Sequence, residues 1–94
     1  DPLLLHMTLF SAMRCCLSEL PEGARLTVEA REGKDGVVVE FQGRVNHGAS
    51  LEAVLNPDLW GDVQATGREM GAAVERLEAG YGVRLLFGQD SGLP

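Results

Sequence analysis

The sequence predicts an α/β (α+β) two-layer sandwich, in which a small, mixed and largely antiparallel sheet is covered on one face by helices. Three observations predict it: an apolar stripe at helical spacing near the start, two alternating segments around a glycine-containing turn, and a further helical segment before a last alternating one. A length of 94 residues with 45% apolar content suits one domain with one core.

The first element is a helix that we expect to begin at Pro2. Asp1 can cap its N-terminus, and Pro2 suits the first turn because its missing N–H has no partner there in any case. Apolar residues at steps of three and four form one buried stripe, made of Leu5, Leu9, Ala12, Met13, Cys16, Leu17 and Leu20. Four residues lie near the border of this stripe: Ser11, Arg14, Cys15 and Ser18. Pro21 and Gly23 then end the helix.

The next two segments alternate between apolar and polar residues, as half-buried strands require. Residues 25–31 and 37–41 flank Gly33-Lys34-Asp35-Gly36, a sequence typical of a hairpin turn. We therefore expect an antiparallel hairpin. Its core-facing residues are Leu26, Val28 and Ala30 in the first strand and Val37, Val39 and Phe41 in the second.

The second half of the sequence has a less regular pattern. From Gly43 to Thr66 we expect an irregular connection with one short helix at residues 50–55. Met70, Val74 and Leu77 are then spaced like one stripe of a helix of about twelve residues that begins near Gly67. Residues 82–87 alternate again and predict the last strand.

Charge and composition exclude several classes of function. A formal net charge of -6 argues against a nucleic-acid partner, because binding to phosphates needs clustered Lys and Arg. The sequence has no apolar run of the roughly twenty residues that span a membrane, so we expect no membrane contact and a cytoplasmic location. Cys15 and Cys16 are adjacent and predict reduced thiols. Because the sequence starts at Asp1 rather than Met, we expect residues 1–94 to be a single domain excised from a longer protein.

Gly67 and Gly71 lie at the start of the predicted second long helix. Glycines there would let backbone N–H groups approach an anion, and the N-terminus of a helix adds about half a positive charge. The two glycines are therefore candidates for binding phosphate. The alternative is a turn that only packs the start of the helix.

The order and spacing of these segments resemble the catalytic, ATP-binding domain of bacterial sensor histidine kinases, whose ATPase fold is shared with gyrase and MutL. Residues 1–17 resemble the first helix of that family, residues 20–28 its helix-to-strand passage, and residues 35–41 the strand before its adenine-binding Asp. Residues 67–74 lie where its second glycine box is expected. The resemblance implies ATP and Mg²⁺ as cofactors. It also implies two partners, a histidine-bearing dimerisation domain of the same protein and a response regulator.

The nucleotide-binding positions of that family carry other residues here. Two asparagines of its first helix, the second of which holds Mg²⁺, correspond to Ser11 and Cys15, and Glu19 is the nearest carboxylate that could substitute as a metal ligand. Its Asp-x-Gly-x-Gly loop corresponds to residues 43–47, and its second glycine box keeps two glycines around Glu69. By resemblance, the candidate nucleotide-binding residues are Gly67, Gly71, Arg68, Gly43, Asn46, Ser11 and Cys15, and the candidate metal ligands are Cys15 and Glu19.

Two functions follow from this resemblance. In the first, a divergent ATP-binding domain of a two-component sensor histidine kinase donates the γ-phosphate of ATP to a histidine on the separate dimerisation domain, with no catalytic residue in this segment. In the second, the domain no longer binds nucleotide and is a protein-interaction module in phosphotransfer signalling. The preserved glycine pair and framework favour the first function, to which the sequence leans, and the replaced binding residues favour the second.

Overall fold

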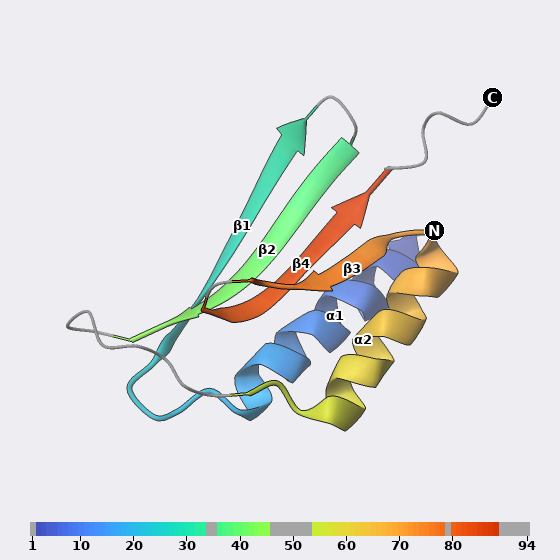
Figure 1. Ribbon diagram of the computed structural model, residues 1–94. Coiled ribbons are helices and arrows are strands. Elements are labelled where there is room, and N and C mark those ends of the chain that lie inside the picture. The colour runs from blue at the N-terminus through green and yellow to red at the C-terminus, as the bar shows by residue number, and fades with distance from the viewer. Residues whose placement is uncertain (1, 34–35, 46–53, 79, 89–94) are drawn as a thin grey trace.

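The computed structural model describes residues 2–33, 36–45, 54–78 and 80–88. Two helices lie on one face of a four-stranded sheet, which confirms the predicted two-layer α+β architecture (Figure 1). In chain order the elements are α1 (Pro2–Ser18), β1 (Arg25–Gly33), β2 (Gly36–Arg44), α2 (Pro57–Met70), β3 (Ala73–Arg76) and β4 (Tyr81–Phe87). The sheet order is β1-β2-β4-β3, and all pairings among these described strands are antiparallel. We expected a mixed sheet, but these strands include no parallel pair.

The predicted hairpin and the predicted last strand are both confirmed. β1 pairs with β2 from Arg25↔Arg44 to Gly33↔Gly36, and β4 pairs with the other side of β2. Gly36 has a φ of 132°, and a Cβ there would overlap the carbonyl oxygen of Phe87. A glycine is therefore required where β2 begins beside the end of β4.

The core lies between the sheet and the two helices. α1 and α2 run antiparallel. The Thr8 hydroxyl in the first half of α1 lies 3.5 Å from the Thr66 carbonyl oxygen near the end of α2, and Leu17 near the end of α1 lines a groove with Leu59 near the start of α2. The Tyr81 hydroxyl donates a buried hydrogen bond of 2.6 Å to the Cys16 carbonyl oxygen and so ties the last turn of α1 to β4. The buried apolar residues are Ala12, Cys15, Cys16, Phe41, Leu55, Val63, Tyr81, Val83 and Leu85.

α2 replaces most of the irregular connection that we expected between Gly43 and Thr66. The Asn56 side chain caps the helix by accepting hydrogen bonds from the backbone N–H groups of Asp58 (2.9 Å) and Leu59 (3.1 Å), and Pro57 follows at the first helical position. The expectation of an irregular chain was therefore wrong for residues 57–66. Of the short helix expected at residues 50–55, residues 50–53 lie outside the described residues, and Val54 and Leu55 are not helical.

The expectation of a helix that begins near Gly67 was also wrong. α2 ends at Met70, and Gly71 is its C-cap with a left-handed φ of 81°, its N–H donating to the Arg68 carbonyl oxygen at 3.1 Å. Beyond this cap the chain forms β3, in which Val74 pairs with Leu85 of β4. Pairing with a strand that is already buried outweighs the local helical spacing in this segment.

The helices do not cover the whole sheet. β1 and the adjacent end of β2 extend beyond them, as Figure 1 shows. Of the three β1 residues expected to face the core, only Leu26 packs against it, whereas Val28 is 48% exposed and Ala30 is exposed. The expectation was therefore wrong for Val28 and Ala30, because α1 and α2 lie against β2, β4 and β3.

Candidate functional site

The two glycines singled out from the sequence lie at the C-terminal end of α2. Gly67 is buried in the last turn, where a Cβ would overlap the Val74 Cγ2 atom of β3. Gly71 caps the same end. Because the C-terminus of a helix carries partial negative charge, the helix-dipole argument for phosphate binding does not apply here. Gly67 instead allows β3 to pack closely on α2, which is a packing role, as in the alternative considered from the sequence.

The other candidate nucleotide-binding residues are spread over several elements. Arg68 is exposed near the end of α2 and lines a small groove of about 170 Å³ beside Val74. Ser11 is half-buried in α1. Gly43 is buried within β2, in register with Leu26 of β1 and Tyr81 of β4. Asn46 lies outside the described residues.

Of the two proposed metal ligands, Cys15 and Glu19, the first does not suit Mg²⁺. Cys15 is fully buried, and burial, aided by the negative charge of Asp62, raises the pKa of its thiol. A protonated thiol is a poor ligand for a hard cation that prefers oxygen. Glu19 is exposed just beyond α1. Within the described part of the chain, no group of three or more His, Cys, Asp or Glu side chains could hold a metal ion.

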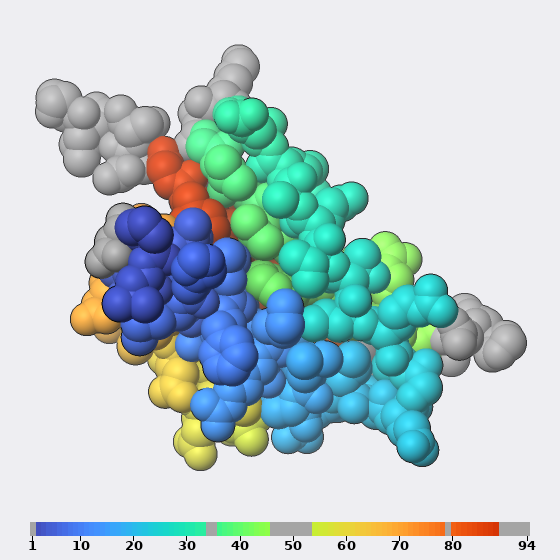
Figure 2. Space-filling view, turned by 180° about the vertical axis from the view of Figure 1, so that it is seen from behind, coloured from blue at the N-terminus to red at the C-terminus, as the bar shows by residue number. Residues whose placement is uncertain are grey.

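The most distinctive surface of the domain is the side of α1 that faces away from the core. Five large apolar side chains stand exposed there, and we call them the outer stripe: Leu3 (68% exposed), Met7 (47%), Phe10 (66%), Met13 (39%) and Leu17 (49%). Their steps of three and four residues place them on one side of the helix. In Figure 2, which views this face, α1 (blue) lies open at the surface beside β2 and β1 (green and teal).

From the sequence we expected Met13 and Leu17 in the buried stripe and Cys15 near its border, and the structure reverses this assignment. The residues that α1 buries are small: Thr8, Ala12, Cys15 and Cys16. Small side chains let α1 approach α2 and the sheet closely. As a consequence, the larger side chains of a helix that is apolar on nearly all sides point outward.

A groove lies beside the C-terminal half of the outer stripe. Phe10, Met13 and Leu17 line it from α1, and Leu59 lines it from the first half of α2, around an open volume of about 460 Å³. Arg14 also borders this groove, and α1 contains no acidic residue. The arrangement can hold an apolar ridge from another molecule, such as the side chains along one face of a helix.

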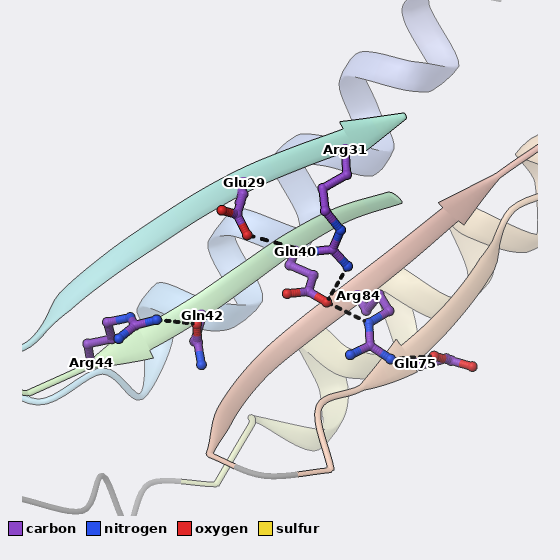
Figure 3. A network of polar contacts seen from close by, with 7 residues as sticks. All are labelled: Glu29, Arg31, Glu40, Gln42, Arg44, Glu75 and Arg84. Carbon is purple, nitrogen blue, oxygen red and sulfur yellow. Dashed lines mark hydrogen bonds and ion pairs between the residues drawn. The ribbon is translucent and has the colours of Figure 1, made fainter. Parts of the chain in front are cut away.

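The opposite face of the sheet carries a network of ion pairs. Glu40 of β2 accepts hydrogen bonds from Arg84 of β4 at 2.8 Å and from Arg31 of β1 at 3.3 Å (Figure 3). The hydrogen bond from Arg84 is the main cause that lowers the pKa of Glu40. Arg84 also pairs with Glu75 of β3 at 3.3 Å, and Arg31 pairs with Glu29 at 3.4 Å. Each of these five charged side chains therefore has a partner of opposite charge within the sheet.

No family model, curated protein or solved structure matches this chain. Neither α1 nor α2 is long and apolar enough to cross a membrane.

Proposed function

We propose that this domain is a protein-interaction module that binds a helix along the outer stripe of α1. The observation that carries the proposal is the exposure of five large apolar side chains on one side of a single helix. Single exposed apolar residues are normal on a protein surface, whereas a contiguous patch of them marks a contact site. The groove beside Leu59 gives this patch the concave shape into which a second helix packs.

The expected strength of this contact follows from the exposed fractions. Each side chain of the outer stripe is about half exposed, so covering it would contribute about 1 kcal/mol, or half of the value for full burial. Five such side chains give roughly 5 kcal/mol, to which the partner's own apolar surface adds, and the loss of translational and rotational freedom opposes both. We therefore expect a reversible contact with a dissociation constant in the micromolar range rather than a permanent one.

This function corresponds to the second of the two that the resemblance implies. ATP binding by a sensor histidine kinase domain stays a prediction, and the buried thiol of Cys15 and the packing role of Gly67 do not favour it. A role in phosphotransfer signalling stays a prediction too. The same holds for the dimerisation domain and response regulator as partners, and for the cytoplasmic location.

The experiment uses a synthetic helical peptide as a probe, with Leu at the first and fourth positions of each heptad and Glu and Lys elsewhere. Fluorescence anisotropy measures its affinity for the wild-type domain and for two variants. Phe10→Asp places a charge at the centre of the outer stripe and should weaken binding at least tenfold. The matched control Val54→Asp makes the same kind of change at a residue that is 74% exposed in a separate groove with Leu55 and Arg76, and should bind like the wild type.

Two outcomes would contradict the proposal. One is the absence of peptide binding by the wild-type domain, and the other is equal affinity for the peptide in the wild type and in Phe10→Asp. Calorimetric titration with ATP, with and without Mg²⁺, tests the other function in parallel. Nucleotide binding that Mg²⁺ strengthens would favour the kinase function instead.

A further inference from the structure

We infer that the helix that packs on the outer stripe is α1 of a second copy of this chain, running antiparallel about a twofold axis at Phe10. This inference rests on the proposed function, because it names the partner of the same surface. It is carried by the arrangement of the exposed residues along α1, by their spacing and by the charges beside them.

The outer stripe is symmetric in sequence about Phe10. Leu3 and Leu17 lie seven residues before and after it, and Met7 and Met13 lie three residues before and after it. A twofold contact uses the same patch on both molecules, so the patch must be complementary to itself. When two α1 helices run antiparallel with Phe10 beside Phe10, Leu3 of each copy faces Leu17 of the other. A leucine therefore meets a leucine at both ends of the contact.

The spacing also suits helix-to-helix packing. Leu3, Phe10 and Leu17 are separated by seven residues each, which is the repeat that keeps one seam of a helix facing a neighbouring helix. At 1.5 Å per residue this seam is about 21 Å long. Because the contact uses one helix and five partly exposed apolar side chains from each copy, we expect a reversible dimer rather than a permanent one.

The charges beside the seam do not oppose this pairing. At 100° per residue, His6 lies on the same flank of α1 as Met13, and Arg14 lies on the same flank as Met7. The twofold axis of an antiparallel pair keeps each flank on its own side of the contact. Arg14 of one copy therefore meets Met7 of the other, and His6 meets Met13, so no like charges face each other. The aliphatic part of an Arg side chain can cover apolar surface while its charged end stays in water.

The main experiment measures self-association by sedimentation over a range of concentrations. Leu3→Glu and Leu17→Arg should each weaken the dimer at least tenfold, because each places a charge opposite a leucine. Combined in one chain, they should restore association to within threefold of the wild type, since antiparallel packing brings opposite charges together at both ends. Parallel packing would instead place like charges opposite each other, and the double variant would stay monomeric, which would overturn the inference.

A second variant tests the axis itself. Phe10→Cys should form a disulfide-linked dimer readily under mild oxidation, whereas Val54→Cys, also at an exposed valine, should not. The natural thiols do not interfere, because Cys15 and Cys16 are fully buried. A chain that stays monomeric at all concentrations but binds the helical peptide would overturn the second copy as partner and leave the proposed function standing. A chain that neither dimerises nor binds the peptide would overturn both, and a dimer insensitive to every substitution on the outer stripe would overturn this inference.

Discussion

We predict that substituting alanine for glycine has opposite effects on stability at two positions of α2. Gly61 is exposed, and a Cβ added there would have no atom within 4 Å. Gly67 is buried two turns later, and a Cβ there would overlap the Val74 Cγ2 atom. We predict that Gly61→Ala stabilises the domain and that Gly67→Ala destabilises it.

The magnitudes follow from two opposing effects. Alanine is favoured over glycine in a helix by about 1 kcal/mol, and this gain applies at both positions. At Gly67 the overlap with Val74 adds an overpacking cost of about 1–3 kcal/mol. Val74 has a stiff χ1, and β3 cannot move away without losing its pairing with β4. We expect a gain of about 1 kcal/mol for Gly61→Ala and a loss of about 1 kcal/mol for Gly67→Ala.

Urea denaturation of both variants measures these changes in the free energy of unfolding. A third variant, Val74→Ala, removes the overlapping methyl groups, so Gly67→Ala should cost less in its presence. If Gly67→Ala stabilises the domain as much as Gly61→Ala does, then β3 does not pack on α2 as described. The continuous helix from Gly67 to Leu77 that the sequence predicted would then explain the result better.

Three further predictions concern single side chains. Tyr81→Phe removes the donor to the Cys16 carbonyl oxygen in the core and should lower the free energy of unfolding by about 1–2 kcal/mol in urea denaturation; an unchanged free energy would contradict this. Because the folded state lowers the pKa of Glu40, its ion pair with Arg84 stabilises the domain at neutral pH, and this stabilisation is lost as the pH falls through the lowered pKa. Between pH 7 and pH 3 the free energy of unfolding of the wild type should therefore fall by about 1 kcal/mol more than that of Glu40→Gln. Equal decreases in the two proteins would contradict this. Burial raises the pKa of the Cys16 thiol to about 12, and the side chains of both Cys15 and Cys16 are fully buried. Neither cysteine should therefore react with a thiol reagent until the domain unfolds. Rapid reaction under native conditions would show that the core is open.

The first half of the fold could be predicted because its patterns are local. The strands of the hairpin alternate around a glycine-containing turn, and the helix before them has a proline at its start and a proline and a glycine after its end. What could not be predicted is how far the helices extend over the sheet. Val28 alternates like a core residue but lies on an edge strand that no described helix covers.

α2 was missed because it contains two glycines and few large apolar residues. Only Leu59, Trp60, Val63 and Met70 are large apolar residues along it, and Pro57 is a residue type that often interrupts a helix. The sequence Asn56-Pro57-Asp58 was the available signal, since a capping side chain before a proline at the first helical position is typical of a helix start. The spacing of Met70, Val74 and Leu77 was misleading, because a cap and a short strand can carry the same spacing as a helix.

The candidate surface was missed for a different reason. α1 is apolar on nearly all sides, so spacing alone could not decide which side faces the core. The structure buries the side with small residues, such as Ala12 and Cys16, and exposes Phe10. The size of the residues on each side, together with the absence of any acidic residue in α1, was the signal that could have indicated a second contact face.

The three methionines of the chain can show whether the outer stripe of α1 contacts another helix. Met7 and Met13 belong to the outer stripe, whereas Met70 lines an apolar pocket with Leu5 and Phe87 on the inner side of α1. With ¹³C-labelled methionine methyl groups, NMR spectra recorded at increasing protein concentration, or with the helical peptide added, follow these residues separately. We predict that the Met7 and Met13 signals shift and that the Met70 signal does not. A shift of Met70 alone, or of none of the three, would contradict the claim.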